Sequence, residues 1–402
     1  MRGGDAAPMG LPLLVAGGGI GGLAAALALA RAGLAVIVLE KAPVLGEVGA
    51  GIQLGPNAFR AFDALGVGDA TRAMAIQVDR LVLMDALSAD EICHIDLGAG
   101  FRARFGNPYA VVHRGDLHAL LARACRALPA ITLRTDAEVV GYAQADGSVT
   151  ALLADGTRVA GAALIGADGL WSKVRRQMLG DGRPRVSGHT TWRSVIPTEA
   201  MPEALRWNAA TLWAGPKCHI VHYPLQGWKT FNLVVTAHND AAEPVAGKPV
   251  PAEEVLAAFG HVHPMAQSII RHGRDWKLWV LCDRDPASGW VEDRVALLGD
   301  AAHPTLQYLA QGACMALEDA VALGQALAAA PADLPGALLA YQSRRLLRTA
   351  RVTLQSRAVG DHVYHPAGTH AALRNAIMGA KTQGEWQQAL AWLYGEDAQA
   401  RP

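Results

Sequence analysis

Three glycine residues near the start of the chain have the spacing that dinucleotide-binding turns require. Gly17, Gly19 and Gly22 follow the apolar run 13–16, and an alanine-rich helical pattern comes next. In such a turn the glycines allow a tight bend, a close approach of the backbone to a pyrophosphate, and close packing of helix on strand. Glu40 ends the next apolar run, where an acidic side chain is expected to meet a ribose hydroxyl. The pattern predicts a nucleotide site; the alternative is an ordinary buried strand–helix–strand unit.

Two further turns combine glycine with aspartate after an apolar run. Asp168 lies between glycines in the segment GADG, and Asp300 follows Gly299, with a helix predicted to begin near Gly312. The carboxyl ends of parallel strands face the crevice in which doubly wound sheets bind ligands. Asp168 is equally compatible with a simple turn aspartate. Arg114 opens another predicted helix and is placed to bind a phosphate, with a solvated surface arginine as the alternative.

The composition bounds the class of protein. The 402 residues are 51% hydrophobic with a formal net charge of zero, so we expect a large core in two or three domains and no nucleic-acid partner. The apolar N-terminal stretch is interrupted by glycines, which favours the mature start of a cytoplasmic protein over a signal peptide, and no apolar run is long enough to span a membrane. The five cysteines form no C-x-x-C pair, so we expect reduced thiols and no metal site.

The order of the patterns predicts an α/β fold with an inserted second domain. The region 10–182 is expected to form the first part of a Rossmann-type nucleotide-binding domain, although 75–106 is a candidate source of strands for a second sheet. The region 183–276 is rich in strand patterns and is expected to be the inserted, β-sheet-rich substrate domain. The nucleotide-binding domain is expected to continue over 277–350, followed by C-terminal helices over 351–402.

Taken together, the three glycine-containing motifs carry a resemblance to a known family. GGGIGG at 17–22, GADGLWSKVR at 166–175 and GDAAHP at 299–304 resemble, in order and spacing, the single-component FAD-dependent aromatic hydroxylases, over nearly the whole chain. Within that family, the third motif with the residues after it, and HIVHYPLQGW at 219–228, look most like 3-hydroxybenzoate 6-hydroxylases. Thr305 departs from the pattern, which has a second proline there.

The resemblance implies FAD as the cofactor and NADH as a transient co-substrate. It implies that the glycines of the first motif contact the FAD pyrophosphate, Glu40 the adenosine ribose, Arg114 the phosphates or the ribityl side, and Asp300 the ribityl hydroxyls. The helix that begins at Gly312 would direct its positive end at the negative edge of reduced flavin. Asp168 is implied in handling both flavin and nicotinamide. The expected cofactor-binding residues are Gly17, Gly19, Gly22, Glu40, Lys41, Arg114, Asp168, Asp300, Gly312 and Ala313.

The reaction that the resemblance implies is insertion of one oxygen atom into a phenol ring. A phenol has a pKa near 10, so a neighbouring base that takes its proton activates the ring. His219 is the expected base, with a structural sheet histidine as the alternative, and Gln307 is expected to hydrogen-bond the same oxygen. Tyr223 shares a strand face with His219 and is expected to contact the substrate, whereas His222 points the other way. Gln53, in a glycine-rich loop over 46–55, is a weaker candidate for the substrate carboxylate.

The expected activity is therefore an NADH- and O2-dependent hydroxylation of a phenolic acid, with 3-hydroxybenzoate converted to gentisate (2,5-dihydroxybenzoate). Alternatives on the same scaffold are hydroxylation of salicylate, 4-hydroxybenzoate or a hydroxynicotinate. Alternatives from other classes are a flavin-binding module without turnover and a plain NAD dehydrogenase, which would be colourless. The oligomeric state is left open, with a homodimer as one possibility.

Overall fold

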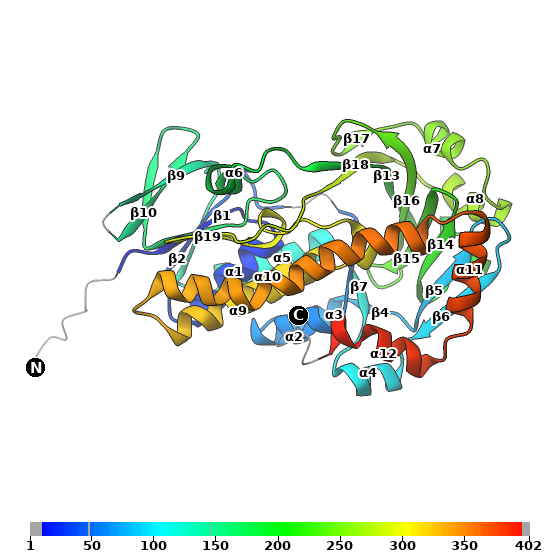
Figure 1. The fold of residues 1–402 in the computed structure, drawn as a ribbon, viewed down its shortest axis with the longest axis horizontal. Coiled ribbons are helices and arrows are strands. Elements are labelled where there is room, and N and C mark those ends of the chain that lie inside the picture. Colours follow the sequence, from blue (N-terminus) through cyan, green and yellow to red (C-terminus); the bar gives the residue numbers. More distant parts are fainter. Residues whose placement is uncertain (1–9, 47–48, 146, 396–402) are drawn as a thin grey trace, which may run out of the picture.

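The computed structural model describes residues 10–46, 49–145 and 147–395. Figure 1 shows an α/β part at one end of the molecule and a β-rich part at the other, with the long helix α10 (Leu334–Val359) running along both. The predicted fold class, α/β with an inserted β-sheet-rich region and C-terminal helices, is confirmed. No helix among the described residues has the length and apolar character needed to cross a bilayer.

The α/β part is built on a six-stranded sheet whose central strands are short apolar runs. Sequences such as LLVA and VIVL are buried on both faces, as parallel strands between two layers must be. All neighbours pair in parallel except the first two strands of the order that follows. The order is β19 (Val291–Glu292), β20 (Val295–Leu297), β12 (Ala163–Gly166), β1 (Leu13–Ala16), β2 (Val36–Leu39) and β8 (Ile131–Arg134).

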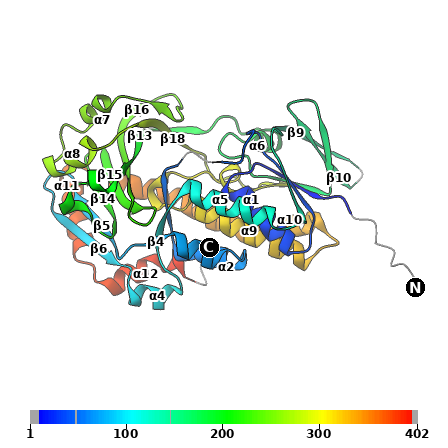
Figure 2. The same cartoon turned by 180° about the vertical axis from the view of Figure 1, so that it is seen from behind.

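Helices α1 (Ile20–Arg31) and α9 (Gly312–Ala329) pack closely against each other in this part. They approach closely because their contact is made of small residues: a Cβ added at Gly324 would lie 2.9 Å from Cβ of Ala28. Seen from behind in Figure 2, α5 (Arg114–Arg126) lies beside α1. The helix predicted to begin near Gly312 is confirmed. The neighbouring helices are α2 (Pro56–Ala64), α3 (Gly68–Met74) and α6 (Lys173–Leu179).

The β-rich part is an eight-stranded sheet covered on one side by a separate hydrophobic core. Two strands from 75–106, β5 (Arg80–Asp85) and β6 (Glu91–Asp96), form one edge of this sheet. The pairing is antiparallel apart from β5 with β14. The other strands are β17 (Lys248–Pro249), β18 (Lys277–Asp283), β13 (Arg185–Pro197), β16 (Thr230–Ala241), β15 (Cys218–Leu225) and β14 (Ala209–Gly215), in that order.

The remaining elements cover the edges of the two large sheets. Small sheets are formed by β11 (Arg158–Gly161), β10 (Ser148–Leu153) and β9 (Val139–Ala145), and by β3 (Gly51–Leu54), β7 (Ala110–His113) and β4 (Ile76–Gln77). The other helices are α4 (Ala99–Phe105), α7 (Ala252–Ala258), α8 (Pro264–Arg271), α11 (Gly368–Gly379) and α12 (Gln383–Tyr394). Short helical turns occur at η1 (Thr198–Ala200), η2 (Glu203–Leu205), η3 (Gly299–Ala301), η4 (Gln307–Leu309) and η5 (Gly360–Tyr364).

Candidate active site

The turn between β1 and α1 is too tight for side chains at two of its glycines. Gly17 has φ +106°, and a Cβ on it would lie 2.4 Å from the carbonyl oxygen of Ala167. A Cβ on Gly22 would lie 1.9 Å from the carbonyl oxygen of Gly17. Helix α1 therefore starts directly against the end of the sheet, and its first N–H groups face the space beyond the strands.

A cavity of about 340 Å³ opens between this turn and the eight-stranded sheet. It brings together the three motifs, which are far apart in the sequence. Its lining includes Gly19 and Gly21 from the first motif, Gly169 from the second, Asp300 from the third, and Gly312 with Ala313 at the start of α9. The N-termini of α1 and α9 thus converge on one cavity, where unpaired N–H groups and the helix dipoles favour a ligand with negative charge.

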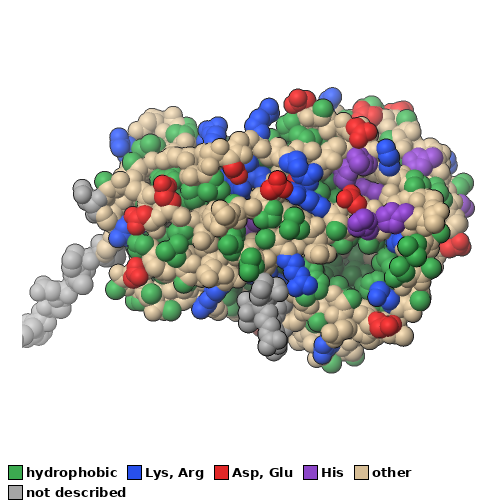
Figure 3. Space-filling view, in the orientation of Figure 1, with side chains coloured by type: hydrophobic (Ala, Val, Ile, Leu, Met, Phe, Trp, Pro, Cys, Tyr) green, Lys and Arg blue, Asp and Glu red, His purple; other side chains and the backbone are tan. Residues whose placement is uncertain are grey.

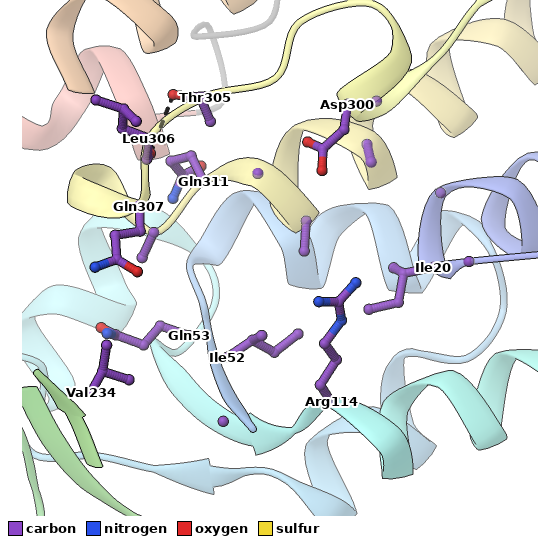
Figure 4. Close-up of a pocket in the computed structure, with 18 of the residues that line it drawn as sticks. Ile20, Ile52, Gln53, Arg114, Val234, Asp300, Thr305, Leu306, Gln307 and Gln311 are labelled. Carbon is purple, nitrogen blue, oxygen red and sulfur yellow. Dashed lines mark hydrogen bonds between the residues drawn. The ribbon is translucent and has the colours of Figure 1, made fainter. Parts of the chain in front are cut away.

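Opposite charges face each other across the cavity at Arg114 and Asp300. Figure 4 shows Arg114 pointing into the space from the start of α5 and Asp300 pointing in from the other side. Burial raises the pKa of Asp300, and the positive charges of His303 and Arg114 offset part of that rise. A carboxyl and a guanidinium placed in this way can bind hydroxyl and phosphate groups of one extended ligand.

The other expected cofactor residues lie around the turn and do not line the cavity. Glu40 accepts hydrogen bonds from the backbone N–H of Gly18 at 2.6 Å and of Ala42 at 2.9 Å, so its carboxylate fastens the glycine turn. Lys41 is exposed beside it. The carboxylate of Asp168 accepts from the backbone N–H of Lys173 at 2.8 Å and from the hydroxyl of Ser172, the N-cap residue, so it helps to cap α6.

At the β-rich end of the cavity, Gln307 is held by a row of polar side chains on the sheet. Thr191, Thr236 and His219 are neighbours across β13, β16 and β15. The Gln307 amide nitrogen donates to the hydroxyl of Thr236 at 3.0 Å and of Thr191 at 3.2 Å, and lies 3.4 Å from Nε2 of His219. The structure therefore brings together the two residues expected to contact the phenol oxygen.

His219 is buried, and its ring is held by a second histidine. Its Nδ1 lies 2.8 Å from Nε2 of His365, and its ring packs edge-on against those of Tyr308 and Tyr364. Burial, with the neighbouring His365 and His189, lowers the pKa of His219 well below its ordinary value. The ring is therefore neutral at pH 7, and the tautomer that donates from Nδ1 to His365 has Nε2 as an acceptor.

Tyr223 and Gln53 line the same end of the cavity. The ring of Tyr223 packs directly against Gly51: a Cβ added at Gly51 would lie 2.4 Å from Cε2 of Tyr223. Gln53 lies in strand β3, not in the loop expected from its glycine-rich surroundings; residues 47–48 of that stretch are outside the described part of the chain. The Oε1 atom of Gln53 accepts from the hydroxyl of Tyr109 at 2.6 Å. His222 does not line the cavity, and its ring packs near Phe231 and Trp207.

Sequence analysis missed two residues at this end, His365 and Arg193. His365 follows η5, and no motif marks it; only the packing of the C-terminal segment on β15 brings it to His219. Arg193 lies on β13 and lines the cavity. Residues two apart in a strand share a face, so Arg193 lies on the same face of β13 as Thr191. This spacing is the signal by which the sequence could have indicated Arg193.

A second cavity of about 180 Å³ adjoins the first and is lined mainly by apolar side chains. The two cavities share Gln53, Val221, Ala310 and Tyr364 in their linings. Figure 3 shows a hollow with hydrophobic side chains at its floor on one face of the molecule, near exposed histidines. The active-site end of the main cavity is therefore bordered by apolar space, which suits an aromatic ring.

The fold and the cavity define a class of protein, a flavoprotein in which a Rossmann-type nucleotide site opens onto a substrate-binding sheet. The backbone cradle at the glycine turn, Arg114, Asp300 and the two helix N-termini fit the pyrophosphate, the ribityl hydroxyls and the negative edge of FAD. The family model described as "FAD binding domain" matches residues 11–356. The chain belongs to this family, the FAD-dependent aromatic hydroxylases.

Among relatives, the chain is 54% identical to 3-hydroxybenzoate 6-hydroxylase 1 of Aquipseudomonas alcaligenes, over 96% of this chain and 98% of that one. It is 48% identical to 3-hydroxybenzoate 6-hydroxylase of Polaromonas naphthalenivorans, over 96% of each chain. Among solved structures, HpxO of Klebsiella pneumoniae, complexed with FAD and uric acid, is 26% identical with a TM-score of 0.84, over 94% of this chain and 95% of that one. A salicylate hydroxylase substrate complex is 26% identical with a TM-score of 0.82, over 98% of each chain.

Proposed function

We propose that this protein hydroxylates 3-hydroxybenzoate at the carbon para to its hydroxyl group and releases gentisate. NADH and O2 are the co-substrates: one oxygen atom enters the ring and the other leaves as water, with the two electrons supplied by NADH. The observation that carries the proposal is the pair formed by the buried His219 and the half-buried Gln307, 3.4 Å apart at the substrate end of the cavity. The names of the two bacterial relatives support the choice of substrate.

The cofactor-binding residues are proposed from their positions around the cavity. Gly19, Gly21 and Arg114 would hold the pyrophosphate, Asp300 the ribityl hydroxyls, and Gly312 with Ala313 the flavin ring. Gly17, Gly22, Glu40 and Asp168 shape the surrounding turns, and Lys41 lies beside them. FAD, once reduced by NADH, supplies chemistry that no side chain has, the transfer of an oxygen atom from O2.

The protein's own residues activate the ring. His219 takes the phenol proton at Nε2, which the neutral ring leaves available as an acceptor; burial lowers the pKa of the ring, and the phenolate charge that forms beside it favours the protonated ring in turn. Removing that proton increases the electron density at the positions ortho and para to the oxygen. The Gln307 amide, whose nitrogen faces Thr191, Thr236 and His219, would exchange one of these contacts for a hydrogen bond to the same oxygen and so orient it. Tyr223 would pack against the substrate.

A substrate panel tests this function. Purified protein loaded with FAD is incubated with NADH, O2 and each of 3-hydroxybenzoate, salicylate, 4-hydroxybenzoate and 6-hydroxynicotinate, and NADH consumption and products are measured. Gentisate formed from 3-hydroxybenzoate, with little turnover of the others, is the expected result. Faster conversion of another acid would replace the proposed substrate. Oxygen uptake that does not rise with any of them would favour a flavin-binding module without turnover.

We also propose the domain boundaries of the chain and the cellular location of the protein. The nucleotide-binding domain would comprise 10–182 and 277–350, the substrate domain 183–276 with strands from 75–106, and the helical region 351–402. Limited proteolysis followed by mass spectrometry tests these boundaries.

The five cysteines are all free thiols, which supports a reducing, cytoplasmic location. Fractionation of cells that express the protein checks this.

A further inference from the structure

The cavity is lined by two arginines that have separate roles. Arg114 lies at the nucleotide end, opposite Asp300, whereas Arg193 lies on β13 at the substrate end. The FAD site accounts for Arg114. Nothing in the proposed reaction so far accounts for a second cation, and a charge placed against a buried sheet is costly unless it has a partner.

The guanidinium of Arg193 is held in place, but not all of its N–H donors have hydrogen-bond partners. One of its terminal nitrogens donates to the Gln307 side-chain oxygen at 3.3 Å, and its carbon Cζ lies 5.4 Å from the ring centre of Trp279. Its Nε is buried and has no hydrogen-bond partner. A guanidinium that lies over an aromatic face keeps the donors in its own plane available for a planar anion.

No carboxylate within the described part of the chain forms an ion pair with Arg193. The ion pairs of the neighbouring strands involve other arginines, such as Arg185 with Asp283. Burial lowers the pKa of Arg193, as expected for a desolvated cation without a counter-ion. The charge is nevertheless retained, because arginine does not lose its proton in proteins. Arg193 is therefore positioned to bind an anionic ligand.

The position of Arg193 relative to His219 matches a ring with two polar substituents. The two residues lie on β13 and β15, two strands and two residues apart, so their backbones are roughly 12 Å apart across the sheet. Gln307 touches both of them, at 3.3 Å and 3.4 Å. Val234 and Val221 continue the row of Arg193 across β16 and β15 and line the cavity, which leaves an apolar surface for the ring itself.

We propose that Arg193 binds the carboxylate of the aromatic acid and thereby sets the specificity for acids over neutral phenols, an inference that rests on the proposed function. Arg193 takes the role that sequence analysis gave to Gln53, whose side-chain oxygen is engaged by Tyr109. Binding at Arg193 and at the His219–Gln307 pair fixes two points of the ring. The substituent pattern of the acid then decides which ring carbon faces the flavin.

The test compares an acid with its neutral analogue in the flavin-loaded protein. Dissociation constants for 3-hydroxybenzoate and 3-hydroxybenzyl alcohol are obtained from the change in flavin absorbance, without NADH, for wild type, Arg193→Met, Arg193→Gln and Arg193→Lys. Arg271→Met, on the exposed surface of α8, is the matched control. Arg193→Met and Arg193→Gln are expected to weaken binding of the acid about 30-fold or more and of the alcohol less than about threefold. Arg193→Lys should be intermediate, and Arg271→Met unchanged.

Equal weakening of both compounds, or no weakening of the acid, would overturn the proposal. Loss of FAD from all three Arg193 variants would also overturn it, because Arg193 would then be structural. The proposed function is judged separately, on wild-type protein alone: if the panel identifies a different aromatic acid, the comparison is made with that acid and its alcohol. If the wild type converts 3-hydroxybenzoate but the Arg193 variants weaken binding of acid and alcohol equally, only this inference is contradicted and the proposed function stands.

Discussion

The Nδ1 atom of His219 lies 2.8 Å from Nε2 of His365, although 146 positions separate the two residues in the chain. The contact joins the middle of the substrate sheet to the segment that follows η5. Because one ring nitrogen of His219 is engaged in this way, the other is directed at Gln307 and the cavity. The strand alone does not fix that orientation.

Replacing the base should separate chemistry from cofactor binding. His219→Ala is expected to slow ring hydroxylation by about 100-fold to 10,000-fold and to increase release of hydrogen peroxide, with FAD content unchanged. Product formation, peroxide and flavin absorbance are measured together. His222→Leu, three residues along the same strand with its ring packed away from the cavity, is the matched control and should hydroxylate normally. Loss of flavin from His219→Ala would instead identify His219 as a structural histidine.

Replacing the second histidine should act through the first. His365→Phe removes the partner of His219 Nδ1 and is expected to lower kcat by about tenfold to 100-fold, with less effect on KM, since partners of this kind orient a functional ring. His365→Gln can restore a hydrogen bond and should recover part of the rate. The acid limb of the pH dependence of kcat should also move to higher pH, because His365 lowers the pKa of His219 and its removal lets that pKa rise. A pH profile identical to that of wild type would contradict the positioning role.

Buried neutral histidines predict a loss of stability in mild acid. Burial lowers the pKa of His222 to about 3, that of His365 to about 3 and that of His189 to about 4. Each binds a proton in the unfolded chain below pH 6.5 but not in the folded one, so stability is complete above that pH and falls as the pH drops toward 4. Between pH 7 and 5 the loss is about 2 kcal/mol for each histidine. Thermal denaturation at the two pH values should show a smaller drop in Tm for His222→Leu than for wild type.

The glycine turn should not tolerate a methyl group. In Gly22→Ala the new Cβ would lie 1.9 Å from the Gly17 carbonyl oxygen, so the turn must open and α1 must move from the cavity. We expect FAD affinity to fall about 100-fold or more, from lost phosphate contacts, as measured by flavin retention on dilution. Gly100→Ala is the control, because that position in α4 has no atom closer than 3.8 Å. Full flavin content in Gly22→Ala would show that the turn does not hold the cofactor.

Helix α9, whose N-terminus borders the cavity, is fixed by a buried ion network. Glu318 on α9 accepts hydrogen bonds from Arg345 at 2.6 Å and from Arg348 at 2.7 Å, and Arg345 also donates to Asp319 at 2.6 Å. Arg345→Met leaves two buried carboxylates with fewer partners and should lower the free energy of unfolding by about 3–5 kcal/mol. The exposed neighbour Arg344→Met should change it by less than about 0.5 kcal/mol. Denaturant unfolding of both variants measures the difference; equal stability would mean that the network contributes little.

The sequence by itself determined the local units of this protein. The turn of Gly17, Gly19 and Gly22 could be predicted because the spacing of its glycines is a local pattern: the left-handed φ of Gly17 and the contact of Gly22 with the Gly17 carbonyl arise within the turn itself, although Gly17 also packs against the distant Ala167. The same holds for the start of α9 at Gly312 and for the shared face of His219 and Tyr223, which follows from the two-residue repeat of a strand.

Only the tertiary structure decided which of these units meet and what each polar group does there. Asp168 and Asp300 look alike in sequence, yet one caps α6 and the other projects into the cavity, because the direction of a turn depends on what packs behind it. His365 and Arg193 gain their positions from strand order and from the path of the C-terminal helices. Contacts between residues far apart in the chain form when the whole hydrophobic core closes, so no local pattern marks them.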